Sequence, residues 1–228
     1  MSLREAAQAR HRVLCGALRV YLVTDRSLTR GRPLASVVET AVRGGATCVQ
    51  LREKELDTNE FLEQAVMLAR LLGPLGIPLV INDNVEVALA CRASGLHLGQ
   101  GDLSPDEARE LLPPDVFIGW SVETLADVMR SASMPVDYLG VSPVFATPTK
   151  TDTKAPWGLD GLRRVRASTA LPLVAIGGIH SGNAGDVLRA GADGLAVVSA
   201  ICAADDPAAA ARELRQIGSS VTWASGAA

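Results

Sequence analysis

Short runs of apolar residues recur at regular intervals along most of the chain, separated by longer amphipathic segments. Within each run nearly every position is apolar, which is typical of parallel strands that are buried on both faces. The predicted strands are Val20–Thr24, Cys48–Arg52, Leu79–Asn82, Leu96–Gly99, Phe117–Ser121, Tyr138–Val141, Leu173–Ile176 and Leu195–Ser199.

The segments between these strands are rich in Ala, Leu, Arg and Glu and have the helical period. Some end in glycine, as at Gly44-Gly45, and Ser104 before Pro105 is a typical helix N-cap. The predicted helices are Pro33–Arg43, Thr58–Leu72, Val85–Ala93, Ser104–Leu112, Leu125–Ser131, Leu159–Ala167, Asn183–Ala190 and Pro207–Arg215. Eight strand–helix pairs close naturally into a barrel, so we predict an α/β fold, a single-domain (β/α)8 TIM barrel.

The length of 228 residues suits one such barrel, which typically has about 200–250 residues. We place the barrel catalytic domain at residues 20–218, after an N-terminal helical extension over residues 1–19 with a short helix at Ser2–Arg12. Residues 219–228 are rich in Ser, Gly and Ala and predict a flexible C-terminal tail.

The charge and the cysteines exclude several classes of protein. A net charge of −3 gives no basic excess for nucleic acid or an anionic membrane. No apolar run reaches the ~18 residues of a membrane span, and the N-terminus lacks the apolar stretch of a signal peptide. The four cysteines form no CxxC pair, so we expect reduced, mostly buried thiols and a cytoplasmic protein.

Polar residues gather where the predicted strands end, which in barrels of this type is the side of the active site. Gln50, Arg52 and Lys54 alternate and therefore share one face of an extended strand. Arg and Lys at such a place predict phosphate binding. The alternative is a solvated strand end with Glu53 as counter-ion, but three polar residues on one face of a buried strand are costly without a ligand.

Asp83 and Asp102 follow two neighbouring predicted strands. A lone aspartate at a strand end often caps a helix, and this remains the alternative for each of them. Two carboxylates that converge repel each other unless a cation lies between them. Mg²⁺ takes few protein carboxylates and completes its shell with water and phosphate, so the pair predicts a magnesium–diphosphate site.

Gly177-Gly178 predicts a second phosphate site, at the loops after the last two strands, with a tight turn as the alternative. Thr147, Thr149 and Lys150 lie on a Pro-rich loop that either closes over substrate or has no role in the site. His97 is expected to be a hydrogen-bonded interior residue, and Trp120 and Trp157 to line a pocket or the core. No Ser/His/Asp order or Cys/His pair supports covalent hydrolase chemistry.

Six blocks of sequence resemble the thiamine phosphate synthase family, from about Val20 to Ile201. They are Tyr21-Leu-Val-Thr-Asp-Arg26, Gln50-Leu-Arg-Glu-Lys54, Ile81-Asn-Asp83, His97-Leu-Gly-Gln-Gly-Asp102, Val144-Phe-Ala-Thr-Pro-Thr-Lys150 and Ala175-Ile-Gly-Gly-Ile179. The second and fifth blocks together are specific, whereas the last occurs in many phosphate-binding barrels. The chain departs from the family pattern at Glu123, where His is frequent, at Ser142, where Gly is frequent, and at His180.

The resemblance implies an alkyl transferase. It would join 4-amino-2-methyl-5-(diphosphooxymethyl)pyrimidine (the pyrimidine diphosphate) to 4-methyl-5-(2-phosphooxyethyl)thiazole (the thiazole phosphate) through a pyrimidine cation, forming thiamine phosphate and diphosphate. Arg52, Lys54, Ser121 and Lys150 would be catalytic, and Asp83 and Asp102 would bind Mg²⁺. The implied substrate-binding residues are Gln50, Leu51, Arg52, Glu53, Lys54, Asn82, Ser121, Thr147, Pro148, Thr149, Lys150, Gly178, Val198 and Ser199.

The implied partners are these small-molecule substrates, with neither nucleic acid nor membrane, and a homo-oligomer is compatible with the sequence. Two other functions stay open. A thiazole tautomerase-like isomerase on the same barrel would bind the thiazole phosphate but would need neither the carboxylate pair nor the cations at residues 50–54. A non-catalytic protein that binds a phosphorylated metabolite would bind ligand without turnover.

Overall fold

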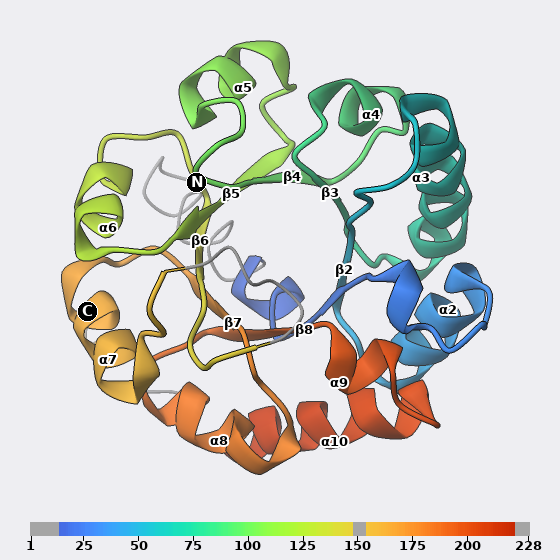
Figure 1. Cartoon of the computed structure of the whole chain (residues 1–228). Coiled ribbons are helices and arrows are strands. Elements are labelled where there is room, and N and C mark those ends of the chain that lie inside the picture. Colours follow the sequence, from blue (N-terminus) through green and yellow to red (C-terminus); the bar gives the residue numbers. More distant parts are fainter. Residues whose placement is uncertain (1–13, 148–153, 222–228) are drawn as a thin grey trace, which may run out of the picture.

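The computed structural model describes residues 14–147 and 154–221, in which eight parallel strands close into a barrel in sequential order (Figure 1). The strands are β1 (Val20–Val23), β2 (Cys48–Leu51), β3 (Leu79–Asn82), β4 (Gly95–Leu98), β5 (Phe117–Val122), β6 (Tyr138–Val141), β7 (Leu173–Ile176) and β8 (Gly194–Val197). The ring closes between β1 and β8, where Tyr21 pairs with Ala196. The predicted fold class is confirmed.

Helices surround the strands on the outside of the ring, as Figure 1 shows. They are α2 (Leu34–Gly44), α3 (Thr58–Leu72), α4 (Val85–Ala90), α5 (Pro105–Leu111), α6 (Leu125–Ser131), α7 (Gly158–Ser168), α8 (Ser181–Arg189), α9 (Ser199–Cys202) and α10 (Pro207–Ser220), with 3-10 turns η1 (Arg26–Leu28) and η2 (Gly73–Leu75). Ser104 caps α5 as predicted, in a capping box with Glu107.

Alternation along each strand divides the apolar residues into two cores. One residue set points outward and packs between the strands and the helices, as Leu22 and Leu51 do. The other points into the barrel and forms a smaller cluster that includes Leu18, Tyr21 and Tyr138. The inward cluster fills the lower part of the barrel and therefore forms the floor beneath its carboxyl-end opening.

The structure differs from the predicted elements mainly at the end of the chain. β8 ends at Val197 because Ser199 begins α9, a four-residue helix too short to have a recognisable period. α10 continues to Ser220, so Ser219 and Ser220, predicted to begin the tail, are helical. Their hydroxyls donate to the Arg215 and Ile217 carbonyls. The predicted helix at Ser2–Arg12 and residues 222–228 lie outside the described residues.

Cys48, Cys91 and Cys202 are buried, as predicted, and all four cysteines are thiols. Burial raises the pKa of Cys15 and of Cys202 to about 11, so these two thiols keep their protons at neutral pH. None of the helices in the described part of the chain is long and apolar enough to cross a membrane.

Candidate active site

A cavity of about 350 Å³ opens at the carboxyl ends of the strands, and every strand or the loop after it contributes to its wall. The lining includes most of the residues predicted for the site. These are Gln50, Arg52, Lys54, Asn82, Asp83, Asp102, Ser121, Thr147, Gly178, Val198 and Ser199. Pro148, Thr149 and Lys150 lie outside the described residues.

β2 and the residues after it supply the cations of the cavity. Arg52 and Lys54 line the cavity, and the Lys54 ammonium donates to Asp83 Oδ2 at 2.5 Å. The backbone N–H of Arg52 donates to the Thr24 hydroxyl at 3.1 Å, which attaches the end of β2 to β1. Both cations therefore face the same space, as the alternation predicted.

Leu51 and Glu53, the residues between these, do not line the cavity. The Leu51 side chain is buried between the barrel and the helices, because alternate residues of a strand point to opposite faces. Glu53 accepts a hydrogen bond from Arg26 at 2.9 Å, and its side chain is only 5% exposed. Glu53 is thus the partner of Arg26, and not the counter-ion of the cavity cations.

The two predicted metal ligands both lie on the cavity wall. Neither caps a helix: the N-cap of α4 is Asn84, whose side chain accepts from Val87 N–H, and the N-cap of α5 is Ser104. Asp83 has a backbone φ of 55°, a conformation that is costly for most residues and tolerated by Asp and Asn. Asp102 Oδ2 accepts from the Gly99 N–H at 2.7 Å. The helix-cap alternative is therefore wrong for both aspartates.

The donor set fits magnesium better than a softer metal. No group of three His, Cys, Asp or Glu side chains within the described ranges could hold a metal ion. Mg²⁺ does not need such a group, because it binds through one or two carboxylates and keeps water and phosphate oxygens. Asp83 and Asp102 are hard oxygen donors beside two cations, which is the setting for a metal bound together with an anionic ligand.

The opposite wall of the cavity, in the residues that the structure describes, carries glycines and small residues in place of charges. Gly178 has a φ of 63°, and a Cβ atom there would lie 2.8 Å from the Ala146 carbonyl oxygen. The Asn183 side chain donates to the Gly178 carbonyl at 2.9 Å and so holds the turn. Val198 and Ser199, at the start of α9, complete this wall. The close approach of backbone explains why glycine is required here.

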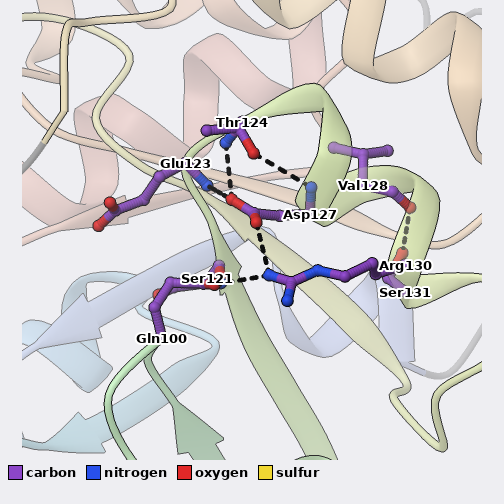
Figure 2. Close-up of polar contacts among 8 residues, drawn as sticks. All are labelled: Gln100, Ser121, Glu123, Thr124, Asp127, Val128, Arg130 and Ser131. Atoms are coloured by element: carbon purple, nitrogen blue, oxygen red, sulfur yellow. Dashed lines mark hydrogen bonds and ion pairs between the residues drawn. The ribbon is translucent and has the colours of Figure 1, made fainter.

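A network on α6 fixes the end of β5, where Ser121 lies (Figure 2). Gln100 donates to the Ser121 carbonyl at 2.6 Å and accepts from Arg130 at 3.1 Å. Arg130 also donates to Asp127 at 2.7 Å. Burial alone would raise the pKa of Asp127, but hydrogen bonds from Glu123, Thr124 and Arg130 outweigh it and lower the pKa. The network joins the loop that carries Asp102 to the strand that carries Ser121.

The cavity wall also carries residues that were not predicted as site residues, among them the ring side chains of Tyr21, His97 and Tyr138. His97 is hydrogen-bonded in the interior as expected, but it also faces the cavity. The signal in the sequence is a polar or aromatic side chain at an inward position of an apolar strand. Trp120 and Trp157 are absent from the cavity wall: Trp120 is buried beneath the Arg130 guanidinium, and Trp157 donates to the Ser142 carbonyl.

A closed (β/α)8 barrel with cations, two carboxylates and a glycine turn around one carboxyl-end cavity is typical of a barrel enzyme that acts on phosphorylated substrates. The model of the thiamine monophosphate synthase family matches residues 20–201. A thiamine-phosphate synthase of Albidiferax ferrireducens is 68% identical over 212 residues, which is 93% of this chain and 97% of that one. The chain therefore belongs to the thiamine monophosphate synthase family, as its sequence blocks predicted.

Two further relatives agree with this membership. A thiamine-phosphate synthase of Chloroflexus aurantiacus is 51% identical over 87% of this chain and 92% of its own. Among solved structures, a thiamine phosphate pyrophosphorylase from Pyrococcus furiosus matches with a TM-score of 0.83 at 38% identity, covering 90% of this chain and 98% of that one. The chain is a transferase of thiamine biosynthesis with the function of a thiamine phosphate synthase.

Proposed function

We propose that this protein joins the pyrimidine diphosphate to the thiazole phosphate, giving thiamine phosphate and diphosphate. One observation supports this choice of substrates: the cavity has two chemically different walls. Arg52, Lys54, Asp83 and Asp102 form a charged wall, and Gly178 lies in an uncharged wall on the other side. An isomerase that binds one phosphate would have no use for the charged wall.

The charged wall suits a diphosphate that leaves. If the pyrimidine C–O bond breaks first, negative charge grows on the diphosphate, and fixed cations stabilise it more than the bound substrate. Arg52 and Lys54 supply those cations in our proposal. Asp83 and Asp102 would hold Mg²⁺, which supplies further charge neutralisation of the leaving group when it is bound.

Gln50 and Asn82 hold the pyrimidine diphosphate in this proposal, and Ser121 contacts the diphosphate. Leu51 and Glu53 do not line the cavity, so we assign them no side-chain contact with substrate. Lys150 belongs to the diphosphate side through the family resemblance alone.

The uncharged wall suits a phosphate that only anchors the nucleophile. Thr147, Gly178, Val198 and Ser199 hold the thiazole phosphate in our proposal, together with Pro148 and Thr149 by resemblance. The thiazole nitrogen carries a lone pair and captures the pyrimidine cation directly, so the step needs no general base. Burial raises the pKa of the Tyr21 and Tyr138 hydroxyls on the floor, so both stay protonated at neutral pH and supply no phenolate that could act as a base. A cytoplasmic location is part of the same proposal and rests on the sequence alone.

The test is to incubate pure, folded protein with both substrates and Mg²⁺ and to detect thiamine phosphate by mass spectrometry and diphosphate by enzymatic assay. We expect both products in equal amounts, and neither when a chelator removes Mg²⁺. Failure of the folded protein to form thiamine phosphate would reject the proposal. Isomerisation of a thiazole phosphate without diphosphate release would favour the isomerase, and ligand binding without turnover would favour the non-catalytic alternative.

A further inference from the structure

Five polar side chains form one continuous row of hydrogen bonds across the floor of the cavity. The Gln50 amide nitrogen lies 2.9 Å from the Tyr21 hydroxyl, which lies 3.0 Å from the Tyr138 hydroxyl. The Tyr138 hydroxyl lies 2.8 Å from His97 Nδ1, and His97 Nε2 lies 2.9 Å from Ser121 Oγ. The row connects five different strands and ends at a residue that our proposed function places against the diphosphate.

The floor has room for this row because two strands carry glycine beneath it. A Cβ atom at Gly119 would lie 2.0 Å from Tyr138 Cζ, and one at Gly140 would lie 3.0 Å from His97 Cε1. The His97 and Tyr138 rings stack with centroids 5.5 Å apart. Every fully buried polar side-chain atom in the described residues has a hydrogen-bond partner, those of the row included. Such a row is a constructed feature of the barrel interior and not a chance contact.

The row has a direction, which follows from its first member. The amide nitrogen of Gln50 can only donate, so the Tyr21 oxygen accepts and its proton is directed to Tyr138. Tyr138 in turn donates to His97 Nδ1. A neutral histidine that accepts at Nδ1 carries its proton on Nε2, which donates to Ser121. The Ser121 oxygen is then an acceptor within the row, and its own proton is directed into the cavity that Ser121 lines.

Both tyrosines have a proton to donate, as this direction requires. Burial raises the pKa of both hydroxyls well above the ordinary value, so each keeps its proton. Cys48 also has a side-chain hydrogen bond with Tyr21, but burial raises the pKa of Cys48, so it stays a thiol, and a neutral thiol is a weak acceptor. The alternative is a Gln50 amide with its oxygen and nitrogen exchanged. Every hydrogen bond in the row would then reverse, and Ser121 would donate to His97.

We propose that Tyr21, Tyr138 and His97 are positioning residues that hold His97 as the Nε2–H tautomer and thereby make Ser121 a hydrogen-bond donor to the substrate. A donor stabilises the negative charge that grows on a departing diphosphate, whereas a serine oxygen with its lone pairs toward the cavity would repel that charge. The effect on turnover rests on the proposed function, but the direction of the row does not.

The first test reads the tautomer directly. The protein has three histidines, so the double variant His11→Asn, His180→Asn keeps only His97. Asn at position 180 can still cap α8, as His180 does. Nitrogen-15 NMR of this variant at neutral pH, without substrates, is expected to show a protonated Nε2 and an unprotonated Nδ1. A proton on Nδ1, alone or on both nitrogens, would overturn the proposal.

A change at the first residue tests the direction. In Gln50→Glu the new carboxyl donates to Tyr21 while it is protonated, as the amide does, but can only accept once it is ionised. We expect the Nε2–H tautomer in the acid form and the Nδ1–H tautomer in the ionised form, with the carboxyl state read from its carbon-13 shift. A tautomer that does not follow the carboxyl contradicts a directed row.

Kinetics test whether the row acts through Ser121. Tyr138→Phe keeps the ring and removes the hydroxyl, so we expect about a tenfold loss of kcat with an unchanged KM for the thiazole phosphate. In a Ser121→Ala background, Tyr138→Phe should lower kcat no further. An equal loss of kcat in both backgrounds would mean that Tyr138 does not act through Ser121. In Tyr21→Phe the link from Gln50 to Tyr138 is lost, so the preference for the Nε2–H tautomer is expected to weaken, and an unchanged preference would mean that Gln50 does not set the direction of the row.

Circular dichroism and melting temperature report whether each variant folds. If a tyrosine variant does not fold, the NMR measurement on the histidine variant still tests the proposal. The two proposals fail separately. Wild-type protein that forms no thiamine phosphate rejects the proposed function, and the wrong tautomer in an active enzyme rejects only the directed row.

Discussion

The two walls of the cavity offer an anion very different surroundings. The wall on β2 to β4 presents full charges, from Arg52, Lys54, Asp83 and Asp102. The wall on β7 and β8 presents a glycine turn at Gly178 and the small residues after β8. Under the proposed function, this contrast lets one barrel treat two phosphate groups differently: fixed charges stabilise the group whose negative charge grows, and close-fitting backbone holds the group whose charge does not change.

Asp83→Asn should break the charged wall most severely. Asn tolerates the positive φ of Asp83 but removes the negative charge, so we expect the rate to fall by about 10²–10³-fold and the Mg²⁺ requirement to rise, with little change in melting temperature. Steady-state rates across a Mg²⁺ titration measure the effect.

The neighbouring residue provides the matched control. Asn84→Ala removes the N-cap of α4 and should cost about 1 kcal/mol of stability while the rate of folded enzyme is kept. If Asp83→Asn lowers stability as much as Asn84→Ala and spares the rate, Asp83 is a structural residue and the comparison of the walls is wrong.

Lys54→Ala should separate the two walls by substrate. Hydrogen bonds to charged groups contribute about 1.5–3 kcal/mol, so the KM for the pyrimidine diphosphate should rise by roughly 10–100-fold. The KM for the thiazole phosphate should stay nearly constant, because Lys54 lies on the other wall. Arg43→Ala, on α2, removes an exposed cation of a surface ion pair and should change neither constant. Equal loss for both substrates would contradict the division.

Gly178→Ala should produce the opposite selectivity. A methyl group there meets the Ala146 carbonyl, and the positive φ disfavours any L side chain, so the turn must shift. We expect a rise of several-fold, to about tenfold, in the KM for the thiazole phosphate, with the diphosphate side nearly unaffected. Gly185→Ala, within α8 and facing only the flexible Arg189 side chain, is the control that should retain activity. A rise in the KM for the pyrimidine diphosphate alone would mean that Gly178 lies on the diphosphate side of the cavity.

The smallest effect is expected at the network between the walls. Asp127 has a lowered pKa in the folded protein, so the stability it contributes is present above the ordinary aspartate pKa and is lost as the pH falls through the folded value. Asp127→Asn should therefore be less stable at neutral pH, and its stability should fall less between neutral pH and about pH 3. Urea denaturation at several pH values measures this, and parallel curves for the two proteins would refute it.

The helices were predictable where local chemistry was strong. Thr58–Leu72 and Leu125–Ser131 begin and end as predicted, because their apolar period is regular and a capping side chain precedes each of them. α9 could not be predicted, since four residues carry no period and its cap Val198 has no side-chain hydrogen bond. Most strand ends were predictable to about one residue, which placed most of the predicted polar residues at the carboxyl-end cavity.

The roles of single side chains were harder to predict from the sequence. Asp83 and Asn84 are adjacent polar residues after β3, and only the structure shows that the second caps α4 while the first faces the cavity. Glu53 was a plausible counter-ion for Arg52 and Lys54, but its distance in space to Arg26 decides its partner. These contacts depend on the direction of each side chain. Periodicity predicts which face of an element a side chain lies on, but not which residue it contacts.

The sequence by itself determined the barrel, the active end of the barrel and the charged and glycine-rich walls of the cavity, because apolar periods and strand-end residues are local properties of the chain. Only the tertiary structure decided which of these residues meet. Tyr21 and Tyr138 are 117 positions apart in the sequence and share a hydrogen bond. His97 on β4 and Ser121 on β5 share another. Closing the barrel brings these inward-facing residues together on the floor of the cavity, and no local sequence pattern predicts which of them are in contact.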